Sequence, residues 1–248
     1  MIAPLTRSLF QAALPLLLLL VLPGYSLESV NQAHTLRDKI YQAYIAGNMP
    51  AWETLLRGAP ANPPELELYE IAMAHYGFIG YCLGLGEKAR ARPYLDRVEG
   101  LTLRLLAMDP DNPRYLALQG ALYGFRMGYQ PQKIMVIGPK SLKAINLALE
   151  KGPDCPEAWV ESGNKDWHMP AAFGGSKERA ISGYEKAIRL MEADPNRNPK
   201  DWYYLNCHMI LADWYASRNL TFLAQEIYRK LLTIEPAFQW AAEKQKTR

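Results

Sequence analysis

One stretch shows how the rest of the chain is built: residues 155–195, which read CPEAWVESGNKDWHMPAAFGGSKERAISGYEKAIRLMEADP. Two segments with helical apolar spacing lie on either side of a loop, Ala172–Gly175. In the second segment the apolar residues form one stripe, and they are Ala180, Ile181, Tyr184, Ala187, Ile188 and Met191. Ser176 follows the two glycines and is placed to cap that helix. The stretch therefore predicts two helices joined by a short turn.

The signals that end this hairpin recur along the chain. Acid–Pro or Gly–Pro pairs close four helical segments, and their prolines are Pro110, Pro153, Pro195 and Pro236. These prolines are 43, 42 and 41 residues apart. A second proline follows the first three, at Pro113, Pro156 and Pro199. Because Asn112 and Asn198 precede two of them, each pair predicts an N-cap followed by the first helical residue.

The period of about 42 residues predicts a helical repeat protein. No segment of strand length alternates apolar and polar residues, so the fold class is all-α. The expected repeats are about 64–110, 113–153, 156–195 and 199–236. Helices near Val30–Ala46 and Pro50–Arg57 precede them, and Ala237–Lys246 forms a capping helix with a polar outer side. No Ser/Gly-rich linker divides the chain, so residues 27–248 are expected to form a single domain.

The last unit carries a resemblance to a known family. Small and large residues stand at the spacing typical of a tetratricopeptide (TPR) repeat, and they are Ala212, Tyr215, Ala224, Tyr228, Leu231 and Pro236. The resemblance implies a right-handed TPR-like solenoid of about four helical hairpins. Residues 64–236 also resemble exported TPR-like proteins of the Bacteroidetes type, through Ile137–Ser141 and Pro170–Gly175. Less closely, the chain is similar to the TPR-type T component of TRAP solute transporters, which implies a ligand.

The N-terminal segment indicates export. Arg7 precedes the apolar run Leu14–Leu22, and Pro23-Gly24 and small residues around Ser26 follow. This order is typical of a secretory signal peptide, here residues 1–26, with a retained amphipathic anchor as the alternative. We therefore expect a periplasmic or secreted protein. Removal of Arg7 leaves a net charge of +2, which argues against nucleic acid as a partner.

The sequence contains no constellation that predicts catalysis. Its cysteines, Cys82, Cys155 and Cys207, are far apart, so at most one disulfide is possible and small buried thiols are expected. The four histidines lie on different predicted helices without a ligand at metal-site spacing. No nucleophile-elbow, zinc-protease or paired-carboxylate pattern is present. We therefore expect a protein that is not an enzyme and has neither cofactor nor metal.

The concave surface formed by the first helix of each hairpin is the default binding groove of such a solenoid. Aligning the repeats places eight residues on it: Arg114, Phe125, Asn164, Trp167, His168, Asn206, Met209 and Asp213. Their amides suit an extended peptide and their aromatic rings a partly apolar ligand, so the partner is a protein, a peptide or a small molecule. A homo-oligomer is also compatible with the sequence. Val160 and Met209 replace the lysines of the TPR carboxylate clamp, which makes an acidic C-terminus an unsuitable ligand.

Other conspicuous residues have structural explanations. Trp159, Trp202 and Trp214 are at helical spacing and are predicted to belong to the hairpin core. Phe173 is expected to plug the solenoid, with a ligand contact as the alternative. One predicted helix carries a basic group with acidic residues interleaved, which predicts an ordinary solvated helix face. The basic residues are Lys88, Arg90, Arg92 and Arg97, and the acidic ones are Glu87, Asp96 and Glu99.

Overall fold

The computed structural model describes the backbone of residues 27–246 and the side chains of residues 36–246. The predicted signal peptide, residues 1–26, lies outside the described residues. Within them the chain forms eleven α-helices and no strand, which confirms the all-α class. The helices are α1 (Leu27–Ile45), α2 (Met49–Gly58), α3 (Glu65–Gly84), α4 (Lys88–Met108), α5 (Pro113–Tyr129), α6 (Ile134–Lys151), α7 (Pro156–His168), α8 (Lys177–Ala193), α9 (Trp202–Ser217), α10 (Thr221–Ile234) and α11 (Gln239–Lys246). Two short 3-10 turns, η1 (Pro131–Lys133) and η2 (Ala171–Phe173), lie inside hairpins.

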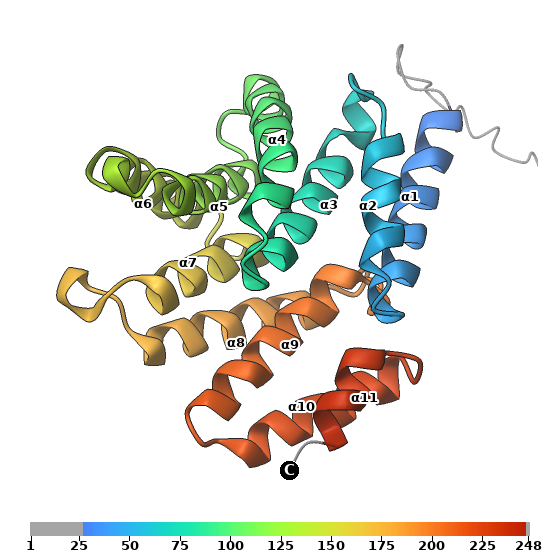
Figure 1. Ribbon diagram of the computed structural model, residues 1–248, viewed down its shortest axis with the longest axis vertical. Coiled ribbons are helices and arrows are strands. Elements are labelled where there is room, and N and C mark those ends of the chain that lie inside the picture. The colour runs from blue at the N-terminus through green and yellow to red at the C-terminus, as the bar shows by residue number, and fades with distance from the viewer. Residues whose placement is uncertain (1–26, 247–248) are drawn as a thin grey trace, which may run out of the picture.

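The helices pack in the order of the chain. α3 packs on α4, α5 on α6, α7 on α8 and α9 on α10, so the predicted four hairpins are confirmed. α1 and α2 form an additional pair before them, and α11 covers α10. Figure 1 shows the hairpins following one another in a curve that brings the last helices back beside the first.

Contacts between the two ends close this curve. α1 touches α9, although the two helices are far apart in sequence. Arg37 Nη2 lies 2.9 Å from Asp201 Oδ2, and the Tyr41 hydroxyl donates to Glu235 Oε2 at 2.7 Å. The Tyr44 ring meets the Trp240 ring edge-on, with centroids 4.9 Å apart. The two ends of the curve therefore meet, with α1 at the N-terminal end lying against α9.

α3 lies at the centre of this packing, against α1, α2, α4 and α5. It is apolar around almost its whole circumference, as a helix covered on every side must be. At Gly77 the Trp202 ring of α9 lies directly against the backbone of α3, because a Cβ atom there would stand 2.6 Å from that ring. Trp202 in turn meets Trp52 of α2 edge-on at 5.0 Å between centroids.

The helix starts follow the predicted caps with one exception. The Asn112 side chain accepts a hydrogen bond from the Arg114 amide at 3.1 Å, and that of Ser176 accepts one from Arg179 at 3.2 Å. Asn198 was predicted to start the last hairpin, but it accepts from the Lys200 amide in a turn. α9 begins later, where Asp201 caps it by accepting from the Tyr203 amide at 2.9 Å. A carboxylate that also pairs with Arg37 fixes the helix start there.

Two of the structural interpretations are corrected. Phe173 does not plug the solenoid, since it lies on the tip of the α7–α8 turn and is 77% exposed. Arg90 and Arg97 are not part of a solvated face, because both bind α2 and the segment after it. Trp202 and Trp214 are buried as expected, whereas Trp159 is half-buried. All three cysteines are buried free thiols.

Candidate functional site

The residues predicted for the concave groove do not form one open surface. Asn164 belongs to a buried polar network that joins α3, α7 and α8. The Tyr76 hydroxyl donates to Glu161 Oε1 at 2.6 Å, and Asn164 Nδ2 donates to Glu161 Oε2 at 3.1 Å. The Tyr184 hydroxyl donates to Asn164 Oδ1 at 2.6 Å. Phe125 stacks on Tyr76 at 5.5 Å between ring centroids, so it covers the same network.

Glu161 is the unusual member of this network. Its side chain is buried, and burial raises the pKa of the carboxyl group, against the opposing hydrogen bonds from Tyr76 and Asn164, to about 7. No cation pairs with it among the residues whose side chains are described. An acid at this position lowers the free energy of unfolding at neutral pH, and this effect can be measured as a dependence of stability on pH.

Arg114 of α5 lies beside this network, where it contacts α7 and α3. Its guanidinium Nε is 3.3 Å from Glu157 Oε1, and its Cζ lies 4.1 Å from the centre of the Tyr69 ring. These residues and Tyr203 border a cavity of about 10 Å³. That volume is about the minimum for a single water molecule, so the cavity is too small for a peptide or a solute.

Trp167 and His168 lie near the end of α7. The Trp167 ring stacks on that of Trp214, with centroids 4.2 Å apart and planes at 5°. Lys177 Nζ lies 4.3 Å from the centre of the Trp167 ring and donates to the Trp167 carbonyl. His168 is exposed beside them. Trp167 is thus half-buried between α8 and α9, and only part of it faces solvent.

The remaining predicted residues, all on α9, have different surroundings. Asn206 accepts a hydrogen bond from the Tyr44 hydroxyl at 3.1 Å, and Met209 is 7% exposed. Asp213 is exposed, but it pairs with Lys244 of α11 at 2.8 Å. The N-terminal and C-terminal helices therefore cover much of the inner side of α9. Whether any of the eight residues binds a partner stays a prediction.

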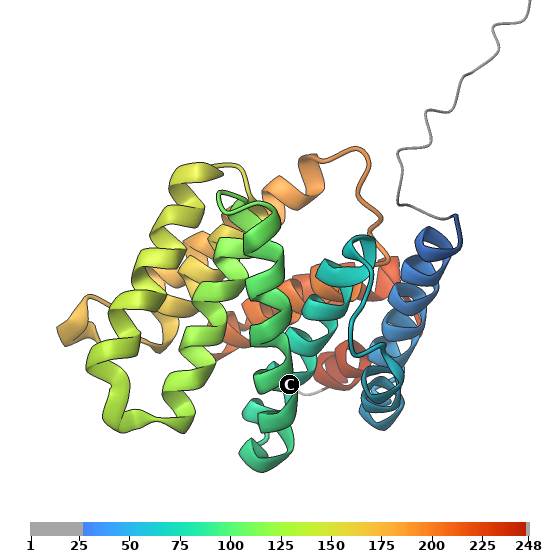
Figure 2. The same ribbon diagram turned by 90° about the horizontal axis from the view of Figure 1, so that it is seen from above.

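The exposed apolar side chains point to a different surface. Of the eleven large apolar residues that are exposed in the described part of the chain, eight lie in or next to the turns inside the hairpins. They are Leu85, Ile134, Met135, Val136, Phe173, Leu220, Phe222 and Leu223. In Figure 2 the α3–α4 and α5–α6 turns lie on the lower side and the α7–α8 turn on the left, away from the links between hairpins at the top. We call the four turns inside the hairpins, together with the helix starts that carry these eight residues, the turn edge.

The turn edge consists of two patches. The first patch comprises Leu85 and residues 134–136, and its two turns are tied together because the Tyr129 hydroxyl donates to the Lys88 carbonyl at 2.7 Å. The second patch comprises Phe173, Leu220, Phe222 and Leu223. Arg218 Nη2 joins its two turns through Glu178 Oε1 at 2.7 Å. Side chains of Ile134, Phe173 and Phe222 are thus presented by connections and first helical turns, where no neighbouring helix covers them.

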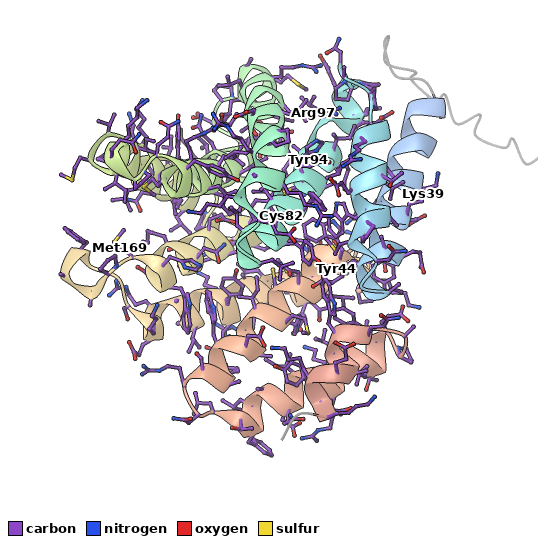
Figure 3. All side chains as sticks on the ribbon, in the orientation of Figure 1. Lys39, Tyr44, Cys82, Tyr94, Arg97 and Met169 are labelled. Carbon is purple, nitrogen blue, oxygen red and sulfur yellow. The ribbon has the colours of Figure 1, made fainter. Side chains whose placement is uncertain are left out.

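A ligand-sized groove lies elsewhere, between α2 and α4. It has a volume of about 430 Å³ and is lined by Glu53, Leu56, Arg57, Ala89, Arg90, Pro93, Tyr94 and Arg97. Figure 3 labels Tyr94 and Arg97 on the side of α4 that faces α2 and α3. Arg90 Nη2 is 2.7 Å from Glu53 Oε2, and Arg97 Nη2 donates to the Ala59 carbonyl at 2.9 Å. The arginines are thus engaged in holding α2 against α4.

Glu53 is the acidic centre of this groove. Burial raises the pKa of its carboxyl group, but hydrogen bonds from Arg90, Tyr94 and Arg57 outweigh burial and lower it to about 2. Sequence reasoning missed this cluster, because Glu53 is separated from Arg90 and Tyr94 by a whole helix. The only available signal was the apolar face of α2, which required a partner surface. The turn patches gave a clearer signal, since three consecutive apolar residues at 134–136 do not fit a helical stripe.

No protein family model matches the chain, and no curated protein matches it. Solved structures do resemble it. The HusA haemophore from Porphyromonas gingivalis is 18% identical with a TM-score of 0.52, over 75% of this chain and 93% of that one. A thermophilic TPR protein of Thermus thermophilus, TTC0263, is 16% identical with a TM-score of 0.47, over 86% and 98% of the two chains. With the pairing of the four hairpins, the HusA likeness indicates that this chain has the fold of a TPR-like helical-repeat protein.

Proposed function

We propose that this protein is a non-enzymatic, exported interaction protein that holds a protein partner in the cell envelope. The observation that carries the proposal is the second patch of the turn edge. Phe173 and Phe222 are 77% and 71% exposed, and Leu220 and Leu223 next to Phe222 are 44% and 40% exposed. Exposed apolar groups that gather in this way on a folded protein are typical of an interaction site.

The composition of the second patch favours a protein partner. Its core is aromatic and aliphatic, as protein interfaces are at their centre. The charges beside it are paired, Arg218 with Glu178 and Arg229 with Glu226, so the patch has little net charge. Phe173 stands on a turn held by Gly174, whose φ of +94° suits glycine, and by Gly175, where a Cβ atom would collide with the Met169 carbonyl. The amides of Phe173 and Gly175 both donate to the Pro170 carbonyl, so the backbone of this turn is already ordered and loses little entropy on binding.

Partner capture with matched variants tests the assignment. Phe173→Glu and Phe222→Glu place a charge on the patch without touching the core, while Leu103→Glu does the same on α4, where Leu103 is 64% exposed outside both patches. We expect the first two variants to lose a partner that wild type and Leu103→Glu retain, because a charge in an apolar interface is left desolvated and unpaired. Equal capture by all four proteins would remove the second patch from the proposal.

Export is tested separately. The full chain should be found in the periplasm or medium of its host, with a mature N-terminus near Leu27, because a signal peptidase cleaves after small residues. N-terminal sequencing of the purified protein decides between cleavage and a retained anchor. An intact Met1 in a membrane fraction would favour the anchor.

A ligand-binding helper is the second candidate. The groove between α2 and α4 favours it, because its volume is in the range of small-molecule sites and it is bordered by Arg57, Arg90 and Arg97. HusA, which shares the fold, is named a haemophore. Native mass spectrometry of the mature protein from its own host tests this candidate. A reproducible small extra mass that Arg57→Ala abolishes would support a ligand in the groove, and a bare protein mass would count against it.

A further inference from the structure

The first patch differs from the second in the arrangement of its apolar residues. Ile134, Met135 and Val136 are consecutive and are 48%, 82% and 61% exposed. α6 packs on α5 through another set of residues, Ile137, Ser141, Ala144, Ile145 and Ala148. The three residues before that stripe lie beyond Tyr129, where α5 ends. They form an apolar tip that the chain's own core neither uses nor covers.

The charges on the α5–α6 hairpin have one sign. Residues 112–149 contain five basic residues and no acidic one. Arg114 and Arg126 pair with acids of neighbouring helices, Glu157 at 3.3 Å and Glu99 at 2.5 Å. The three lysines, Lys133, Lys140 and Lys143, are exposed and form no ion pair with a described residue. The tip of α6 is thus apolar with unpaired lysines beside it, and in the α3–α4 turn of the same patch Glu87 is neutralised by Arg90 at 2.8 Å. In the second patch the charges of both signs are paired.

We propose that the first patch docks on an anionic lipid surface, with residues 134–136 at the boundary between headgroups and acyl chains. Apolar side chains flanked by lysines bind such a surface through burial of the apolar groups and attraction of the lysines to lipid phosphates. The long lysine side chains reach the headgroups while their methylene groups stay along the apolar layer. A protein interface fits this patch less well, because lysine is depleted there.

No helix in the described part of the chain is long and apolar enough to cross a membrane. This inference does not depend on the second patch or on its partner. Docking through the α5–α6 turn leaves the α7–α8 and α9–α10 turns as separate binding elements of the same edge.

Flotation of the mature protein with vesicles tests the proposal. The vesicles contain phosphatidylcholine and phosphatidylglycerol in a two-to-one ratio, and pure phosphatidylcholine vesicles are the neutral comparison. We expect binding to the anionic vesicles only, and weaker binding as salt rises, because salt screens the attraction. Replacing Lys133, Lys140 and Lys143 by glutamine should weaken binding by roughly fivefold for each lysine at low salt. Inorganic phosphate at the headgroup concentration should not displace the protein, since it offers no apolar layer.

Two further variants make the test specific to the tip. Met135→Glu should lose vesicle binding by more than tenfold while circular dichroism stays unchanged, because Met135 is 82% exposed. Phe173→Glu, the matched control on the second patch, should change binding by less than twofold. Equal binding to neutral and anionic vesicles, or an equal loss in both variants, would overturn the assignment. So would dimerisation of the wild-type protein that Met135→Glu abolishes without any vesicle binding, since the patch would then join two copies of the chain.

Discussion

Replacing Glu161 by glutamine is expected to stabilise the protein at neutral pH. The carboxyl group has a pKa of about 7 in the folded protein, against an ordinary value of 4.5. Between these two values the folded protein holds a proton that the unfolded chain has released, so wild-type stability falls as pH rises through this window. A difference of about 2.5 pKa units corresponds to about 3 kcal/mol of unfolding free energy at pH 7. Glutamine has no proton to lose, so this loss disappears.

The pH dependence of wild-type stability cannot by itself reveal the Glu161 contribution, because His75 also contributes to it. Burial lowers the pKa of this imidazole from 6.5 to about 4. Its contribution has the opposite sign, because the unfolded histidine takes up a proton that the folded one excludes, and stability rises with pH from about 4 to 6.5. The two residues nearly cancel in wild type. The difference between Glu161→Gln and wild type removes the histidine contribution and isolates the carboxyl group.

Urea denaturation followed by circular dichroism measures this difference from pH 4.5 to pH 7. We expect the unfolding free energy of Glu161→Gln relative to wild type to increase by about 3 kcal/mol across the window. A constant offset of about 1 kcal/mol is allowed, because the new amide must rearrange its hydrogen bond with Asn164. Glu150→Gln, an exposed change on α6, is the matched control for the loss of a carboxyl group. A difference between Glu161→Gln and wild type that does not change with pH would refute the buried-carboxyl reasoning.

The packing and the cysteines allow three further predictions. Gly77→Ala should cost about 1–3 kcal/mol in thermal unfolding, since its Cβ would stand 2.6 Å from Trp202, whereas Gly80→Ala in the same helix meets nothing within 4 Å and should be neutral or stabilising. Glu53→Gln should lower the unfolding free energy by about 3 kcal/mol at pH 7, because Arg90 and its other partners lower the pKa of this carboxyl group to about 2. This loss should vanish as pH falls from 4.5 toward 2. A loss that does not depend on pH would contradict the ion-pair account. The three buried thiols should react with Ellman's reagent only after unfolding, and rapid reaction of the native protein would show that their helices open.

The sequence predicted the elements of the fold because their signals are local. Pro110, Pro153 and Pro195 recur at nearly constant spacing, and each ends a helix through the geometry of its own backbone. The apolar stripe of α8 required only residues within that helix. The exception, the start of α9, depended on Asp201, whose carboxylate is held by a helix far away in sequence.

Less of the candidate site could be predicted from the sequence. The concave residues were chosen on the assumption that successive hairpins leave the inner side open. That assumption left out α1 and α3. Tyr76 of α3 donates to Glu161, Gly77 of α3 makes room for the Trp202 ring, and Arg37 of α1 pairs with Asp201, so the inner side is not open. The apolar residues 134–136 can be recognised in the sequence, but their exposure depends on α5 ending at Tyr129.

The sequence by itself determined the helical class, the length of the repeat and the pairing of helices into hairpins, because helix ends and apolar stripes are set by residues a few positions apart. Only the tertiary structure decided which surfaces remain free. The curvature accumulates over several hairpins until α1 meets α9, and a contact between helices more than 150 residues apart leaves no periodic trace in the chain. That closure covers Asn206 and Met209 and leaves the turn edge, with Met135 and Phe173, as the exposed apolar surface.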